Sequence, residues 1–211
     1  MQMPQSIFRF GQLKYAEPFV NNGLISFGPA ANYNDSKLSD AQRDNELRRS
    51  SSPDIKRHQF AVTSPGSQPK ALQNLLSIKV SYDIRDVTGE YLRYYILCCS
   101  LCNNRRFYSE FPEDDCCITI HDVPEFHRRF NTALRIQRPE WGGGSRQVAY
   151  FQPDQVIAPE TTIDLVFMKE ASYAWQQEFR FALIAPLDQV DSNRIPLDLG
   201  GLTDICSIAN K

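Results

Sequence analysis

The segment 175–184 constrains the fold most, because its side chains alternate in character as those of a β-strand do. Its two faces carry Glu178, Arg180 and Ala182 on one side and Phe179, Phe181 and Leu183 on the other. A strand anchored by three apolar side chains can hold a glutamate rigidly at the wall of a cleft, as a charge-stabilising catalytic carboxylate requires. The alternative interpretation is an exposed ion pair between Glu178 and Arg180 on an edge strand.

The composition predicts one globular domain over residues 1–211. The chain has 211 residues, of which 42% are hydrophobic, so it can bury a substantial core. A net charge of −2 argues against binding nucleic acid by bulk electrostatics and leaves only local basic patches for that purpose. Residues 1–10 contain no secretory apolar core, and the apolar run 91–102 is too short to span a bilayer. We therefore expect a cytoplasmic protein without a membrane partner.

The cysteines are expected to be reduced thiols. They are Cys98, Cys99, Cys102, Cys116, Cys117 and Cys206. Strand alternation turns Cys99 away from Cys98 and Cys102, so these three thiols cannot share one zinc ion. The adjacent pair at 116 and 117 has the same difficulty. The spacing therefore predicts neither a zinc site nor a disulfide.

The rest of the chain predicts many short strands and few helices, which is typical of an α+β fold. Strands are expected at 6–13, 24–27, 75–82, 91–101, 147–151, 163–168 and 195–199. Helices are expected before Gly23, at 39–49 and at 122–135, the last capped by Asp122 ahead of Pro124. The glycine-rich segment 141–144 indicates a hinge or break, and 50–66 indicates an exposed excursion.

Motifs spread along the chain resemble two known groups. The stretch 22–27 with Tyr33, Asn34 and Asp35, then Cys98-Cys99-Ser100, then Lys169 with Trp175, Glu178 and Arg180, resembles a widespread bacterial family of uncharacterised proteins. The order Arg9, Ser100 and Gln176-Gln177-Glu178 is similar to the arginine, serine, glutamate pattern of ADP-ribosyltransferases. The resemblance implies two small packed mixed β-sheets around an NAD cleft, with flanking helices.

The resemblance also implies a role for each matching side chain. Arg9 contacts the NAD phosphates and ribose, since a guanidinium gives forked, charge-assisted bonds to phosphate. Ser100 braces the nicotinamide ribose and the glutamate. Glu178 bonds the ribose and stabilises the oxocarbenium-like centre left when nicotinamide departs. Gln176 orients the acceptor; an amide is a poor general base, which favours an acceptor that ionises readily or is already nucleophilic.

The remaining expected NAD-binding residues are Tyr33, Asn34, Lys169 and Arg180. Tyr33 could stack on the nicotinamide or adenine ring, or simply pack in the core. Asn34 could form only a turn, and Lys169 could be a loop charge.

The other matching residues also have plain structural interpretations. Ser100 could be a satisfied strand hydroxyl, and Arg9 could pair with Glu17. The sequence departs from well-studied transferases after Ser100, where Leu101-Cys102 replaces a threonine and a second serine.

The sequence thus predicts an ADP-ribosyltransferase that uses NAD as substrate, needs no metal and modifies a macromolecule. The pairs Arg105-Arg106 and Arg128-Arg129 slightly favour RNA or DNA over protein as the acceptor. The resemblance suggests a toxin or phage-defence effector, with an antitoxin as a candidate partner. Hydrolysis of NAD to free ADP-ribose is a further outcome of the same site.

Two alternatives belong to other functional classes. A metal-dependent nuclease toxin would draw its ligands from His58, His121, Asp122, His127 and either Asp114 or Asp115. Its phosphate-binding groups would be the arginine pairs, including Arg48-Arg49. The other alternative is a non-catalytic binding module on a degenerate transferase scaffold, because a fold does not guarantee its usual chemistry.

Overall fold

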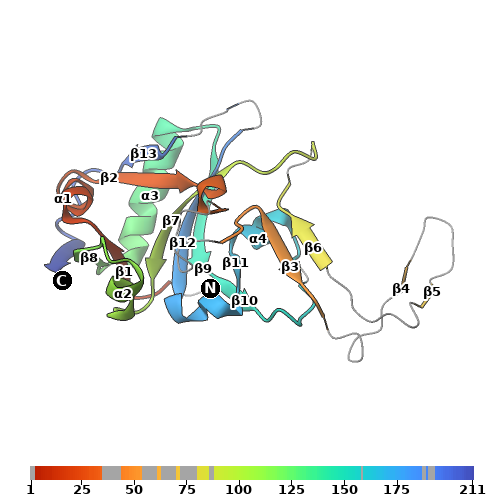
Figure 1. The fold of residues 1–211 in the computed structure, drawn as a ribbon. Coiled ribbons are helices and arrows are strands. Elements are labelled where there is room, and N and C mark those ends of the chain that lie inside the picture. The colour runs from red at the N-terminus through yellow and green to blue at the C-terminus, as the bar shows by residue number, and fades with distance from the viewer. Residues whose placement is uncertain are drawn as a thin grey trace.

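A computed structural model describes residues 3–34, 44–53, 61–62, 70–71, 80–85, 88–157, 159–186, 189 and 193–211. These residues form an α+β structure in which strands outnumber helices, as the sequence predicts (Figure 1). No helix in these ranges has the length and apolar character needed to cross a membrane.

The elements follow one another along the chain in this order. They are β1 (Ile7–Gly11), α1 (Leu13–Asn22), β2 (Leu24–Pro29), the 3₁₀ helix η1 (Ala30–Asn34), β3 (Arg48–Ser51), β4 (Ala61–Val62), β5 (Lys70–Ala71), β6 (Val80–Asp83), β7 (Tyr94–Ser100), α2 (Arg106–Glu110), β8 (Cys116–Ile120), α3 (Val123–Gln137), β9 (Gly142–Gln147), β10 (Ala149–Phe151), α4 (Thr162–Val166), β11 (Met168–Glu170), the 3₁₀ helix η2 (Ala171–Gln176), β12 (Glu178–Ile184), β13 (Ile195–Asp198) and β14 (Cys206–Asn210).

The large sheet is forked at β7. One edge of β7 pairs along its whole length with β12, which pairs in turn with β9. The other edge pairs with β2 at Ile96 and with β1 at Ser100, so two strands follow one another along the same edge. Strand β13 extends the β2 branch, and β8 and β14 extend the β1 branch. Between the two contact points β1 and β2 diverge and leave an opening beside Cys98.

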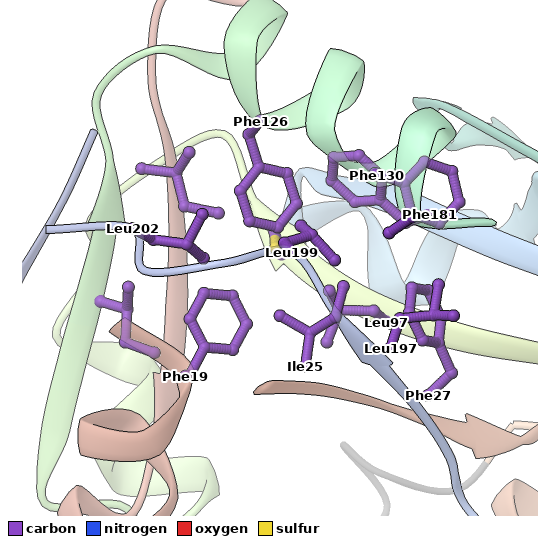
Figure 2. Close-up of a cluster of buried hydrophobic side chains, with 14 of the residues drawn as sticks. Phe19, Ile25, Phe27, Leu97, Phe126, Phe130, Phe181, Leu197, Leu199 and Leu202 are labelled. Carbon is purple, nitrogen blue, oxygen red and sulfur yellow. The ribbon is translucent and has the colours of Figure 1, made fainter. Parts of the chain in front are cut away.

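The apolar face of β12 packs against α3 to form the main core. Figure 2 shows Phe126 and Phe130 of this helix lying against Phe181 of β12, and the Phe130 and Phe181 rings meet edge to face at 5.4 Å. Alternation in the strand and helical spacing in α3 direct these rings toward each other. The α3 helix begins where the sequence predicts, since the Asp122 carboxylate accepts a hydrogen bond of 2.9 Å from the Glu125 N–H.

The opposite face of the sheet is also covered. A second cluster packs Tyr94 and Ile96 of β7 and Ala182 of β12 against residues of α4 and β10. Strand β12 is therefore an interior strand that is buried on both faces. The alternative interpretation of Glu178 and Arg180 as an exposed ion pair on an edge strand is wrong, since Arg180 is 0% exposed.

The glycine-rich segment is a strand and not a hinge. Residues 142–147 form β9 and pair antiparallel with β12. A Cβ at Gly143 would lie 2.6 Å from Cδ2 of Leu134 in α3 and 3.1 Å from the Ala182 carbonyl oxygen. A larger residue would force Leu134 or the Ala182 backbone to shift, so the close approach of α3 to this strand favours glycine.

Two further elements differ from the predicted ones. The segment 162–166 is the helix α4 and occupies most of the strand predicted at 163–168. The helix starts there because Thr161 and Asp164 form a capping box. Arg48–Ser51 is the strand β3, paired with β6, although the sequence pattern indicates a helix over 39–49. The long-range pairing outweighs the weak helical preference of this polar segment.

The ends of other elements agree more closely with the sequence. Helix α1 ends at Asn22, and Gly23 follows with a φ of 71°, where an L-residue would be strained. Helix α2 and strands β8 and β14 have no counterpart in the prediction. Within the expected excursion at 50–66, Ser51 belongs to β3 and is buried, whereas 54–60 and 63–66 lie outside the described residues. Residues 39–43 and 75–79 lie outside them as well.

Gly143→Ala is expected to lower the free energy of unfolding by about 1–3 kcal/mol, because the added methyl overpacks the contact between β9 and α3. Urea denaturation of the variant and wild type measures the difference. Gly144→Ala is the matched control, since nothing lies within 4 Å of a Cβ there. Equal losses in the two variants would contradict the packing explanation.

Candidate functional site

An open pocket of about 220 Å³ lies at the fork, where β1, β7 and β12 meet. Arg9 of β1, Ser100 at the end of β7 and Glu178 at the start of β12 all line it. The pairing places Phe8 and Glu178 opposite Ser100, on either side of β7, and Arg9 follows Phe8 and reaches the pocket at the Cys98 carbonyl. Three residues far apart in the sequence thus reach one pocket.

Most of the other candidate residues contribute to the same pocket. Tyr33, Lys169 and Gln176 line it, whereas Arg180 lies behind Glu178 and is not part of the wall. The side chain of Asn34, and the whole of Asp35, lie outside the described residues.

The carboxylate of Glu178 is held between two cations. Its Oε1 accepts a hydrogen bond of 2.8 Å from Arg180 Nε, and its Oε2 accepts one of 3.3 Å from Lys169 Nζ. Burial alone would raise the pKa of Glu178, but Arg180 and Lys169 outweigh it and lower the pKa to about 2. Glu178 is therefore an anion at neutral pH, with 3% of its surface exposed.

A tight turn aims Gln176 and Glu178 at the same pocket. The intervening Gln177 has a φ of 42°, in the left-handed region that non-glycine residues seldom adopt. The Leu101 N–H donates to the Gln177 carbonyl at 2.8 Å, and the Glu178 N–H donates to the Tyr150 hydroxyl at 2.8 Å. The surrounding structure thus maintains an unfavourable backbone conformation directly before the buried carboxylate.

Ser100 fixes this turn. Its hydroxyl donates to the Gln176 carbonyl at 2.7 Å and accepts a hydrogen bond of 3.1 Å from the Cys102 N–H. The hydroxyl is therefore satisfied within the protein, as in the structural interpretation of this residue. Its contribution to the site is to position Gln176 and, through the turn, Glu178.

Glu46 also lines the pocket, although it is not among the residues predicted from the sequence. Its carboxylate binds both terminal nitrogens of Arg180, at 2.9 and 3.0 Å, and accepts a bond of 2.7 Å from Arg49 Nη2. Glu46 is 1% exposed, and the arginines hold its pKa below the ordinary value against the effect of burial. Its position in a polar, charged segment resembled a solvated surface, so no sequence signal distinguished it.

Arg9 bridges the opening of the fork. Its Nη1 donates to the Cys98 carbonyl at 2.8 Å, and its guanidinium has no ion pair with Glu17 or another described residue. A neighbouring pocket of about 540 Å³ shares Arg9, Phe10 and Asp114 with the first. The guanidinium therefore lies where the two pockets adjoin.

Aromatic side chains form part of the wall and rim. Tyr33 lines the pocket, and burial raises its pKa well above the ordinary value, so its hydroxyl stays protonated. Trp175 lies 5.1 Å from the ring of Phe107, a wall residue, and the Arg106 guanidinium stacks on its indole at 4.1 Å. Lys169 Nζ lies 4.5 Å from the Tyr173 ring.

The candidate metal ligands do not meet in the described part of the chain. His121 hydrogen-bonds Ser207 and His127 hydrogen-bonds Ser145, each at 2.7 Å, while Asp122 caps α3. No group of three or more potential ligands that could hold a metal is found among the described residues, and His58 lies outside them. The six cysteines are free thiols.

The arginine pairs are largely engaged with carboxylates. Arg49 is buried against Glu46, and Arg128 and Arg129 both bind Glu125. Arg106 pairs with Glu110 across one helical turn.

Comparison with known proteins gives no match among protein-family models, curated proteins or solved structures. The resemblance to ADP-ribosyltransferases therefore depends on the sequence motifs alone.

Arg180→Met is expected to lower the free energy of unfolding by about 3–5 kcal/mol, because it leaves Glu46 and Glu178 buried without their shared cation. Methionine keeps most of the side-chain volume, so the loss reports mainly on charge. Denaturant unfolding measures it, with Arg128→Met as the control; that guanidinium is 65% exposed, and its loss should cost less than about 1 kcal/mol. Equal losses in the two variants would show that the buried network contributes little.

The stability that Glu178 provides is expected to depend on pH. Its pKa falls from an ordinary 4.5 to about 2 on folding, so its ion pairs contribute fully above pH 4.5 and are lost as the pH falls toward 2. Unfolding of wild type and Glu178→Gln at a series of pH values measures this contribution. The difference between the two proteins should shrink with acidification, and a difference independent of pH would contradict the lowered pKa.

Proposed function

We propose that this protein is an NAD-dependent ADP-ribosyltransferase with an ADP-ribosyltransferase-like fold. It breaks the bond between nicotinamide and ribose in NAD and transfers ADP-ribose to a macromolecule. The observation that carries the proposal is the convergence of Arg9, Ser100 and Glu178, from three different strands, on one open pocket. The forked sheet supports the proposed fold, because the divergence of β1 and β2 along β7 provides a cleft between two groups of strands.

The ionised state of Glu178 suits this reaction. Departure of nicotinamide leaves positive charge on the ribose ring, and a fixed, almost completely buried carboxylate stabilises such charge strongly. The bonds from Arg180 and Lys169 prevent the carboxylate from rotating, so it needs no reorganisation when the charge develops. A lowered pKa keeps it anionic over the physiological pH range.

Arg9 suits the diphosphate of NAD. It lies at the boundary between the smaller pocket, which contains Glu178, and the larger adjoining pocket. A dinucleotide with its nicotinamide ribose at Glu178 would reach past Arg9 into the larger pocket. A guanidinium at that point supplies forked, charge-assisted hydrogen bonds to phosphate.

The acceptor is proposed to be a macromolecule, with nucleic acid favoured over protein. Arg105 is exposed beside Arg106, which stacks on Trp175 near the pocket, and a cation next to an aromatic ring can receive an unstacked base. Unrestricted transfer of this kind would harm a cell, which supports a toxin or defence effector controlled by an antitoxin. Gln176 accepts a hydrogen bond of 3.0 Å from Lys169 Nζ and can orient the acceptor.

Glu178→Gln is expected to lower nicotinamide release by about 10²- to 10³-fold, because the amide no longer offsets the positive charge on the ribose. Purified protein is incubated with adenine-labelled NAD and separate pools of RNA, DNA and protein. Nicotinamide release and the label on each pool are both measured. Glu170→Gln is the matched control, since its carboxylate bonds Ser172 at 3.0 Å and does not line the pocket.

Other outcomes would favour the alternative functions. Binding of NAD without nicotinamide release in any pool would indicate a binding module on a transferase-like scaffold. Cleavage of the nucleic acids that stops on chelation would indicate a metal-dependent nuclease. Either result would overturn the proposed transfer reaction.

A further inference from the structure

The carboxylates that line the pocket differ in how they are bound. Glu46 and Glu178 share the Arg180 guanidinium, and each is almost completely buried. Asp114 also lines the pocket, but its carboxylate makes no hydrogen bond or ion pair with any residue that the structure describes. It is therefore the carboxylate in this wall that remains available to a ligand.

The fold holds Asp114 next to Arg9. It lies in the turn between α2 and β8, and its N–H donates to the Phe111 carbonyl at 3.0 Å. The next residue, Asp115, donates its N–H to the Gly11 carbonyl at 3.0 Å and so ties the turn to the end of β1. Asp114 lines both adjoining pockets, as Arg9 does.

The surroundings of Asp114 raise the pKa of its carboxylate toward neutrality, so that the group can bind and release a proton near neutral pH. Partial burial and the neighbouring Glu113 raise the pKa of Asp114 to about 6, while Arg9 opposes the shift. The other charged or titratable groups that act on it are Asp115 in the same turn, Lys211 beyond β14, Tyr108 of α2 and Cys116 of β8. A base whose pKa lies just below the working pH is well matched to proton removal.

The proposed reaction requires a group that accepts a proton, and the residues predicted from the sequence do not provide one. A nucleophile that carries a proton must lose it when it bonds to the ribose. Gln176 is an amide and cannot take the proton, and Glu178, with a pKa of about 2, is a very weak base. Asp114 is the remaining carboxylate of the pocket wall.

We infer that Asp114 is the general base of this site and that the acceptor is a nucleophile that carries a proton, such as a hydroxyl group or water. This inference rests on the proposed transferase function and adds a catalytic residue to it. It also widens the acceptor class beyond groups that are already ionised.

The step balances without another reactant. The acceptor oxygen forms a bond to the anomeric carbon of the nicotinamide ribose, and the bond between that carbon and the pyridinium nitrogen breaks. The electron pair of the broken bond goes to nicotinamide, which leaves neutral. The proton of the acceptor goes to the Asp114 carboxylate and then to solvent.

Asp114→Asn tests the inference, with NAD as substrate and water or the labelled pool as acceptor. The variant should release nicotinamide about 10²- to 10⁴-fold more slowly with little change in KM for NAD, because the change removes the base and not the binding groups. Asp154→Asn, the same chemical change at an exposed position outside the pocket, should leave the rate unchanged. Equal slowing in this control would overturn the inference.

The pH dependence gives a second readout. The wild-type rate should rise with pH as Asp114 loses its proton near pH 6 and then level off. Asp114→Asn should lack this rise. A rise that persists in the variant would assign it to another group, such as Asp44, whose pKa is also raised to about 6, and would overturn the inference.

Azide separates failure of the inference from failure of the proposed function. Azide is an anionic nucleophile and needs no base, so it should restore nicotinamide release in Asp114→Asn but not in Glu178→Gln. Wild-type turnover that depends on Glu178, together with full activity of Asp114→Asn, would overturn only the inference. Absence of nicotinamide release from the wild type would overturn both.

Discussion

The ion pairs that Arg180 makes with two carboxylates are the interaction on which the site depends. The guanidinium holds Glu178, two residues earlier on the same strand, and Glu46, from a distant part of the chain. Leaving any of these charges buried without its partner would cost several kcal/mol. Loss of any one of these side chains would therefore destabilise the folded protein. Arg49 and Lys169 complete the charge balance around the two carboxylates. The network thus joins three segments at the floor of the pocket and fixes the orientation of Glu178.

The forked sheet converts this buried network into an accessible site. If β1 and β2 formed one continuous neighbour of β7, the strand edge beside Cys98 would be covered. Their divergence leaves room for Arg9 to reach the Cys98 carbonyl and for the pocket to open beside Glu178. The turn held by Ser100 then brings Gln176 to the same wall. Strand pairing therefore brings the proposed phosphate-binding, positioning and charge-stabilising residues together.

The sequence predicted the parts of this arrangement that depend on local periodicity. The two faces of β12 follow from alternation, and α3 follows from its apolar spacing and the Asp122 cap. Gly143 of β9 could not be interpreted in the same way, because the preference for glycine there arises from α3 packing across the strand. Glu46 was missed for a related reason, since it becomes a buried ion-pair partner only when a distant Arg180 approaches it. Long-range contacts of this kind leave no periodic signal in the sequence.

A crystal structure with carba-NAD, a carbocyclic analogue whose bond to nicotinamide resists cleavage, would show whether Glu178 faces the reacting end of the dinucleotide. The ring carbon that bears nicotinamide is expected to lie within about 4 Å of the Glu178 carboxylate, and the diphosphate is expected to contact Arg9. The Arg180 and Lys169 bonds to Glu178 should remain in place. An analogue bound away from this pocket, or one with its nicotinamide end far from Glu178, would contradict the account.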